Sequence, residues 1–268
     1  MLPELHILGR SVPTYGLLAM TGVLAALLYL KLEERRLQES NADIDLAFLY
    51  SLIGAFIGAK LLSIITSLPD IRAAWPFLVK TPAAFLQNYL LSGFVFYGGL
   101  YGALLVCLLY AKHERLDFAA LLCRLLPTLA LIHGFGRVGC FLTGCCYGIP
   151  HPTLGVILPN SAIAPHDVPL LPVQLYEAAL EFLLFAVLAR MGRKQKDGYA
   201  MLGVYLLTYG IARFFLEFCR GDAYRGFIGP LSLSQAISLP TALLGLFLLL
   251  YAARRRQPSE GAVKPPLC

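Results

Sequence analysis

Seven apolar stretches, each about 20 residues long, limit the folds open to this chain more than any other feature. A helix of about 20 apolar residues crosses the hydrocarbon core of a bilayer and satisfies its own backbone hydrogen bonds there. Charged residues make up only 14% of the 268 residues, against about 25% in soluble domains. The sequence therefore predicts an all-α, polytopic membrane protein with seven transmembrane helices. The predicted spans are Val12–Leu30, Ile44–Ile65, Leu91–Ala111, Phe118–Phe135, Val173–Arg190, Tyr199–Phe218 and Leu231–Ala252.

These spans leave little of the chain outside the membrane. Seven spans of about 20 residues take roughly half of it, so we expect no separate soluble domain. One membrane domain is predicted over residues 1–257, followed by a short polar tail over residues 258–268. Residues 1–14 lack a basic region followed by a small-residue cleavage site, which argues against a cleavable signal peptide.

The lysines and arginines between the spans predict the orientation of the chain. Thirteen of them follow the odd-numbered spans, and six lie on the other side of the membrane. Loops rich in lysine and arginine stay in the cytoplasm, so the N-terminus is predicted outside and the C-terminus inside. These residues form short clusters beside the spans, which fits contact with anionic lipid and argues against nucleic-acid binding. The thirteen are Lys31, Arg35, Arg36, Lys112, Arg115, Arg190, Arg193, Lys194, Lys196, Arg254, Arg255, Arg256 and Lys264.

A polar stretch at the end of the fourth span, residues 133–148, indicates a functional site. It contains His133, Arg137, five glycines and three cysteines. A glycine-dense break at membrane depth is stable only where it is buried in protein or lines a cavity, and glycine lets a ligand approach the backbone. An arginine at such a point suits an anionic oxygen, above all a phosphate. Histidine suits proton transfer near neutral pH, although His133 is alternatively a core histidine with a buried partner.

Ionisable residues inside the other spans are costly, and this makes them candidate functional residues. Arg213 and Glu217 lie four residues apart and can pair on one helix face. This pair either serves helix packing alone or places a second arginine opposite Arg137, completing a two-arginine anion clamp. Glu177 and Glu181 have the same spacing. Each is either neutralised by an arginine of a neighbouring span or orients a substrate headgroup.

Three cysteines in this stretch, Cys140, Cys145 and Cys146, raise the question of a metal site. Structural zinc sites combine two closely spaced ligand pairs, and no second pair accompanies these cysteines. We therefore predict neither a metal nor a cofactor, with the thiols packing and hydrogen bonding near the outer face. An outer disulfide or a redox pair is the alternative, although adjacent cysteines can bridge only in a strained geometry.

Glycines also open the third span, directly after Tyr97. Gly98 and Gly102 form a small-xxx-small pair, which predicts close packing against another helix. The alternative is a ligand beside Gly98 and Gly99, with the Tyr97 hydroxyl directed at it.

Several short motifs, in order along nearly the whole chain, carry a resemblance to a known family. They are Tyr15-Gly16-Leu17, Gly54–Lys60, Tyr97-Gly98-Gly99-Leu100, Gly136–Gly144 with Gly148, Pro172–Glu177, Tyr209-Gly210 with Arg213 and Glu217, and Ser232–Pro240. Together they resemble the phosphatidylglycerol–prolipoprotein diacylglyceryl transferase family of bacterial inner membranes. The resemblance implies seven spans with an outside N-terminus, in agreement with the charge count.

The resemblance also implies a reaction, the first step of lipoprotein maturation. Diacylglycerol passes from phosphatidylglycerol to the lipobox cysteine thiol of a prolipoprotein, giving a thioether and glycerol phosphate. The partners implied are the lipid, the lipobox segment and the membrane. Arginines would stabilise the phosphate leaving group, and the incoming thiol, with a pKa of about 8.5, must lose its proton. The predicted catalytic residues are Tyr97, His133, Arg137 and Arg213, and the predicted substrate-binding residues are Tyr15, Gly98, Gly99, Cys140, Thr143, Gly148, Glu177, Tyr209 and Glu217.

The chain departs from the family pattern at four positions. Tyr97 stands where the family has histidine, Cys140 where it has asparagine, Cys145 where it has an acidic residue, and Leu171 where histidine is frequent. Tyrosine, with a pKa of about 10, is a poor base at neutral pH. Either His133 or Glu177 takes over that role, or the chain is a paralogue with another acceptor. A lipid-binding or transport protein without catalysis is the third alternative.

Overall fold

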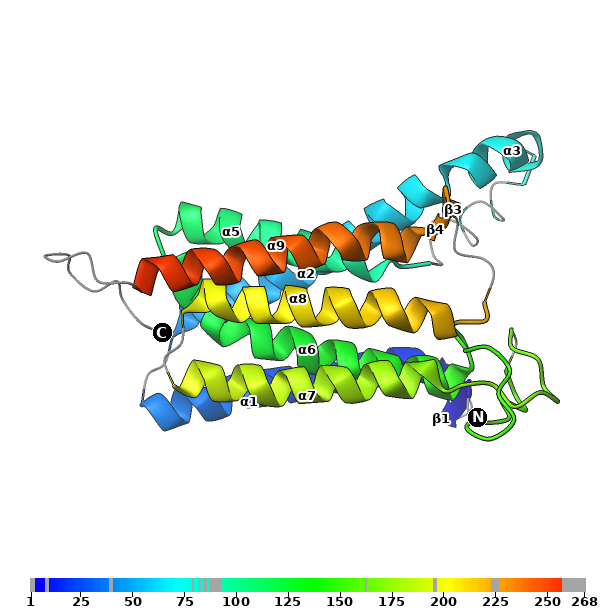
Figure 1. Cartoon of the computed structure of the whole chain (residues 1–268), viewed down its shortest axis with the longest axis horizontal. Helices are drawn as coiled ribbons and strands as arrows, with labels where there is room; N and C mark the ends of the chain where they lie inside the picture. The colour runs from blue at the N-terminus through cyan, green and yellow to red at the C-terminus, as the bar shows by residue number, and fades with distance from the viewer. Residues whose placement is uncertain are drawn as a thin grey trace, which may run out of the picture. The chain divides into compact units, whose positions relative to one another are not determined.

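The computed structural model describes residues 3–7, 10–38, 41–78, 80–81, 83, 86, 93–161, 163–194, 197–222 and 227–256. The chain divides into two compact units, one of residues 1–40 and 122–268 and the other of residues 41–121. Long helices make up most of the regular structure (Figure 1). The predicted tail, residues 258–268, and the start of the third predicted span, residues 91–92, lie outside the described residues.

The first unit is a bundle of long helices with two short hairpins. The antiparallel hairpins pair β1 with β2, Glu4 opposite Pro13, and β3 with β4, Phe227 opposite Ser232. The first four residues of α6 belong to the second unit. The elements are β1 Glu4–Ile7, β2 Arg10–Pro13, α1 Thr14–Leu37, α6 Phe118–Thr143, α7 Val173–Arg193, α8 Gly198–Leu216, the short 3-10 helix η2 Glu217–Cys219, β3 Phe227–Ile228, β4 Leu231–Ser232 and α9 Leu233–Arg256.

Small residues let the helices of this unit approach one another closely. A Cβ atom at Gly22 of α1 would lie 3.0 Å from the Phe135 side chain of α6. One at Gly203 of α8 would lie 2.9 Å from the Gly245 carbonyl oxygen of α9. Between α6 and α7, the rings of Phe135 and Phe182 meet edge to face. These contacts fix which faces of α6 turn toward α1 and α7, and which face of α8 turns toward α9.

Helix α6 runs further than the sequence predicted. The glycine-dense stretch was expected to break the helix after Phe135, but the helix continues to Thr143. Gly134 and Gly139 serve packing instead of turns, since a Cβ at Gly134 would lie 2.7 Å from the Phe182 ring and one at Gly139 would lie 3.2 Å from the Tyr15 ring. The turn comes at Gly144, whose φ of +74° is a left-handed conformation that ends helices and favours glycine.

The second unit consists of α2 Ala42–Thr66, α3 Leu68–Leu78 and α5 Phe96–His113. Asn41 caps α2, because its side chain accepts a hydrogen bond of 3.0 Å from the Asp43 amide. Helices α2 and α5 touch along glycines: a Cβ at Gly98 would lie 2.3 Å from the Gly58 carbonyl oxygen, and one at Gly102 would lie 2.3 Å from that of Gly54. The predicted small-residue packing of the third span is therefore confirmed.

Five of these helices are long and apolar enough to cross a membrane, namely α1, α2, α6, the Gly198–Cys219 segment that contains α8, and α9. Their outward faces carry large apolar side chains such as Leu28 and Phe247, which are 60% and 62% exposed. The third and fifth predicted spans also form helices, α5 and α7, but these are not among the five. Helix α7 carries Glu177, Glu181 and Arg190, which reduce its apolar character. The protein is therefore an all-helical membrane protein with at least five candidate spans among the described residues.

The long proline-rich connection between α6 and α7 folds back on itself. Isolated bridges join Leu170 to Pro150 and to Val156. Leu158, Ala164 and Leu170 form a small buried apolar cluster. The connection therefore has an apolar centre of its own beside the C-terminal end of α6.

Candidate functional site

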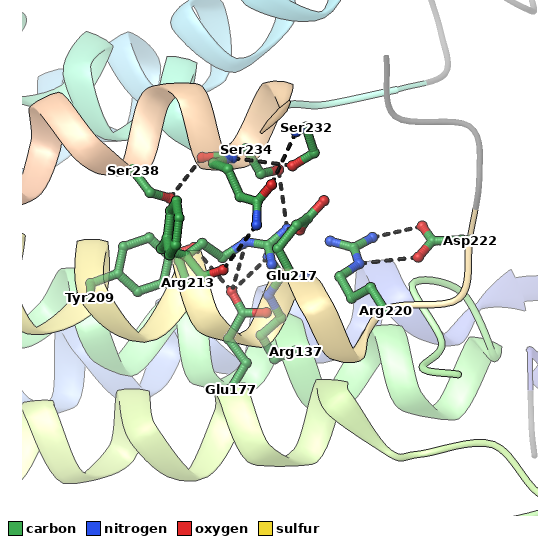
Figure 2. Close-up of polar contacts among 12 residues, drawn as sticks. Arg137, Glu177, Tyr209, Arg213, Glu217, Arg220, Asp222, Ser232, Ser234 and Ser238 are labelled. Atoms are coloured by element: carbon green, nitrogen blue, oxygen red, sulfur yellow. Dashed lines mark hydrogen bonds and ion pairs between the residues drawn. The ribbon is translucent and has the colours of Figure 1, made fainter. Parts of the chain in front are cut away.

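Glu177 of α7 is the centre of a buried polar network in the first unit. Its side chain is 1% exposed. Its Oε1 atom lies 2.9 Å from Arg137 Nη2 of α6 and accepts a 3.0 Å hydrogen bond from the Tyr209 hydroxyl of α8. The same oxygen lies 3.9 Å from Arg213 Nε. Figure 2 shows the side chains of both arginines directed at this carboxylate. One carboxylate thus brings together two guanidinium groups that would otherwise repel each other.

His133, one helical turn before Arg137, ties the network to Glu181. Arg137 Nε donates a 3.2 Å hydrogen bond to His133 Nε2. Because arginine has no acceptor, Nε2 must be the unprotonated nitrogen, and the proton is then on Nδ1. His133 Nδ1 lies 2.8 Å from Glu181 Oε1. A histidine, and not the expected arginine, is therefore the close partner of Glu181. The His133 ring, held by Glu181, in turn holds the Arg137 side chain in place.

Arg213 connects the network to the beginning of α9. Its Nη2 atom lies 2.7 Å from Glu217 Oε2 and donates a 3.2 Å hydrogen bond to the Ser234 hydroxyl. The pairing of Arg213 with Glu217 was predicted from their spacing and is confirmed. Figure 2 shows this contact next to the Glu177 centre. Arg137 and Arg213 are both buried, so water and salt screen their electrostatic interactions only weakly.

Arg220, which follows η2, is a further buried cation that the sequence reasoning counted only as a loop charge. Its Nε and Nη2 atoms donate to the two carboxylate oxygens of Asp222 at 3.1 and 2.7 Å (Figure 2). Burial lowers its pKa, but the Cys146 thiol and Asp222 raise it, and the net shift is upward. Its position three residues after the buried Glu217 is the sequence feature that could have indicated a buried arginine here.

The three cysteines after Arg137 lie together. The sulfur atoms of Cys140, Cys145 and Cys146 are all within 4.8 Å of one another. The Cys145 thiol donates to the Cys140 carbonyl oxygen at 3.6 Å and lies 3.4 Å from the Thr143 hydroxyl. Hydrogen bonds from the Cys140 and Cys145 thiols lower the pKa of the Cys146 thiol well below its ordinary value. Burial opposes this shift and Arg220 adds to it.

Comparison with known proteins identifies the family to which this geometry belongs. The family described as prolipoprotein diacylglyceryl transferase matches residues 4–251. The chain belongs to this family. A phosphatidylglycerol–prolipoprotein diacylglyceryl transferase of Clostridium tetani is 34% identical over 253 residues, covering 94% of this chain and 98% of the relative. The second enzyme of that name in Clostridium perfringens is 35% identical over 91% of this chain and 92% of its own length. One of Bordetella avium is 32% identical over 91% of this chain and 92% of its own length.

The other residues predicted to bind substrate in this transferase fold have mostly local contacts. Thr143 donates to the carbonyl oxygens of Gly139 and Cys140 in the last turn of α6. Gly148 lies against Leu171, since a Cβ there would be 2.5 Å from the Leu171 carbonyl oxygen. Tyr15 is 43% exposed and lies beside Gly139. A role of these three residues in binding substrate remains a prediction.

Tyr97, Gly98 and Gly99 belong to the second unit, at the start of α5. Tyr97 is buried, and its ring lies 6.0 Å from that of Phe96. Gly98 and Gly99 face α2, where Gly58 and Ala55 lie against them. Helix packing accounts for both glycines in this transferase, and their predicted contact with substrate stays a prediction.

Two contacts of the network escaped the sequence reasoning. Ser234 was only part of a motif, although it receives a hydrogen bond from Arg213. Gln174 of α7 donates a 2.6 Å hydrogen bond to the Cys145 carbonyl oxygen and so holds the loop after α6. Both residues are polar and lie in the first turn of an apolar helix, and this feature of the sequence could have indicated that they make partly buried hydrogen bonds.

Proposed function

We propose that this chain is a phosphatidylglycerol–prolipoprotein diacylglyceryl transferase. The observation that carries this proposal is the family match over residues 4–251, supported by relatives of that name at 32–35% identity over nearly their whole length. The chain takes phosphatidylglycerol as donor and the lipobox cysteine of a prolipoprotein as acceptor. In this proposal the chain lies in a bacterial inner membrane and crosses it seven times, with α5 and α7 among the spans, the N-terminus outside and the C-terminus in the cytoplasm.

In the proposed reaction, the acceptor sulfur attacks the carbon of the diacylglycerol unit that is bonded to the phosphodiester oxygen. A carbon–sulfur bond forms, the carbon–oxygen bond breaks, and glycerol phosphate leaves with the electron pair. The thiol proton passes to a base or to solvent. Negative charge develops on the phosphate oxygens, so cations fixed beside them stabilise the transition state most.

Arg137 and Arg213 are the residues that we assign to this phosphate. They converge on Glu177 Oε1 from α6 and α8, at 2.9 and 3.9 Å. Glu177 holds both guanidinium groups beside one oxygen atom, to which the Tyr209 hydroxyl also donates. His133 accepts from Arg137 Nε and fixes the plane of that guanidinium group. In this assignment Arg137 and Arg213 are catalytic, whereas Glu177 and His133 position them.

The test is a transfer assay on the detergent-purified chain with acyl-labelled phosphatidylglycerol and a lipobox peptide. The proposal predicts labelled peptide and stoichiometric glycerol phosphate, neither of which forms with a peptide whose lipobox cysteine is replaced by serine. Release of glycerol phosphate without labelled peptide would support a different acceptor, an alternative that the tyrosine at position 97 favours. Lipid binding without turnover would contradict the enzymatic proposal.

Complementation adds a cellular test. A bacterial strain depleted of its own diacylglyceryl transferase should grow when it expresses this chain. The matched control is the Arg137→Ala variant, which should insert into the membrane to the same level and fail to restore growth.

A further inference from the structure

The cysteines at the end of α6 form a donor set that the proposed arginine site does not use. Cys140 lies in the last turn of the helix, and Cys145 and Cys146 lie in the turn that follows it. All three sulfurs are within 4.8 Å of one another. They come from seven consecutive residues, so the arrangement is local and belongs entirely to the first unit.

The spacing of these sulfurs is close to that of a three-thiolate metal site. Zinc–sulfur bonds are about 2.3 Å long, so two sulfurs of a tetrahedral site lie roughly 3.8 Å apart. The sulfurs lie up to 4.8 Å apart, so side-chain rotations that bring two sulfur atoms about 1 Å closer together would put them in ligand position. Thiolates are the ligands that select soft ions such as Zn²⁺ and Cu⁺.

The backbone around the cysteines is held in an uncommon conformation that brings the thiols together. Cys146 has a φ of +57°, which costs a residue other than glycine about 1–3 kcal/mol. Gly144 has a φ of +74°, and its carbonyl oxygen accepts a 3.0 Å hydrogen bond from Ser161. Gln174 holds the Cys145 carbonyl oxygen. Contacts from α7 and from the long connection thus stabilise this turn.

The charges nearby suit an anionic complex. Three thiolates and one Zn²⁺ carry a net charge of −1. The Arg220 and Arg137 guanidinium groups both interact electrostatically with Cys146. Among the residues that the structure describes, no fourth histidine, cysteine, aspartate or glutamate joins the three sulfurs. Three protein ligands with an open fourth position are typical of catalytic zinc sites, whereas structural sites have four.

We propose that Cys140, Cys145 and Cys146 bind a soft metal ion, with Zn²⁺ the first candidate, and leave its fourth position open to an incoming thiol. This departs from the prediction of no metal, which rested on the spacing of the cysteines along the sequence. The second half of the proposal rests on the proposed function: a thiol bound to the ion would lose its proton to solvent. The acceptor cysteine would then attack as a thiolate without a separate base.

The first experiment measures metal binding without any transfer assay. The detergent-purified chain, reduced and freed of metal, is titrated with Co²⁺, which gives an intense thiolate-to-cobalt charge-transfer absorption. We expect one cobalt per chain, displaced by Zn²⁺. Cys146→Gly should weaken binding by more than about 100-fold, beyond the range for loss of an outer-shell contact. Glycine tolerates the left-handed backbone at this position, so that variant keeps the fold.

Cys219→Ser is the matched control. Cys219 is a half-buried free thiol of the same unit, and it is not part of the cluster. The cobalt absorption should be unchanged in this variant. Absence of the absorption in the reduced native chain, or its persistence in Cys146→Gly, would overturn the metal site.

The second experiment tests the open position. Adding the lipobox peptide to the cobalt-loaded chain should strengthen the charge-transfer absorption, because a fourth thiolate joins the ion, and the cysteine-to-serine peptide should not. Removal of the metal should lower transfer, and Zn²⁺ should restore it. Full transfer by the metal-free chain would refute the activating role. Cobalt binding without any transfer to the peptide would refute the proposed function and leave the metal site standing.

Discussion

At the scale of single residues, the chain places two arginines around one buried carboxylate. Arg137 and Arg213 would repel each other if Glu177 Oε1 did not lie between them. Removing one partner of a buried ion pair costs about 3–5 kcal/mol, because the remaining charge is left without compensation. A lipid phosphate carries a negative charge, as Glu177 does, and has more acceptor oxygens. In the proposed reaction the phosphate would therefore compete with Glu177 for these two arginines.

Substitution of Arg137 should separate its charge from its geometry. Arg137→Ala should abolish transfer, and Arg137→Lys should recover only part of it, because an ammonium group lacks the planar pair of donors that contacts both Glu177 and His133. In Arg137→Lys, the loss of one hydrogen bond to a charged group should cost about 1.5–3 kcal/mol, which lowers the rate roughly 10- to 100-fold. The initial rate of peptide labelling at matched expression measures the effect.

Arg193→Ala is the control for that series. Arg193 pairs with Glu33 of α1, and its side chain is 53% exposed. Glu33 is buried but keeps Arg36 as a partner at 2.8 Å, and Arg193 is not part of the Glu177 network, so transfer should be unchanged. Undiminished transfer by Arg137→Ala would remove Arg137 from the site.

The two carboxylates of α7 should respond differently to neutralisation. Glu177→Gln leaves two buried arginines facing each other, so the melting temperature should fall strongly. Glu181→Gln keeps an oxygen acceptor for His133 Nδ1 and should lower the melting temperature less. Added glycerol phosphate should recover part of the loss in Glu177→Gln, because an anion bound to the folded state stabilises it. Equal losses in both variants, with no effect of glycerol phosphate, would contradict the central role of Glu177.

At the scale of helices, the sequence predicted most elements and misjudged where one of them ends. Apolar runs of about 20 residues are a strong signal for helices that cross a membrane, and each of the seven predicted spans overlaps a helix. The end of α6 was placed eight residues too early, at Phe135 in place of Thr143, because glycines and Arg137 read as a break. A glycine in a loop and a glycine under a neighbouring helix look alike in a sequence. The contacts of Gly134 with Phe182 and of Gly139 with Tyr15 distinguish them in the structure.

The glycine contact between α2 and α5 yields a prediction about stability. Gly58→Ala should destabilise the chain by about 1–3 kcal/mol, as overpacking does, because its Cβ would lie 2.3 Å from the Gly98 carbonyl oxygen. Gly16→Ala in α1 is the matched control, since nothing lies within 4 Å of a Cβ there. Thermal unfolding in detergent measures both. Equal melting temperatures for Gly58→Ala and the native chain would mean that α2 and α5 do not touch at this point.

At the scale of the whole molecule, the sequence predicted the class of protein, most residues of the arginine network and the Arg213–Glu217 pair, but not the partner of Glu181. Charge and spacing identified Arg137, Glu177, Arg213 and Glu217, because ionisable residues in apolar spans are rare. The pairing of His133 with Glu181 depends on how α6 and α7 are rotated, which no linear pattern records. The three thiols were judged by their spacing along the chain, whereas a helix end followed by a left-handed residue brings them together in space.

Orientation in the membrane is the property of the whole chain that the lysine and arginine count predicts and that labelling can test. Leu154, in the connection after α6, is 60% exposed, and His113, at the end of α5, has a side chain that is 83% exposed. In a background without other cysteines, Leu154→Cys should react with a membrane-impermeant maleimide on intact spheroplasts, since that connection is predicted outside. His113→Cys should react only after the membrane is opened. Recovery of both proteins in the membrane fraction at equal levels is the control, and the reverse pattern of labelling would invert the proposed topology.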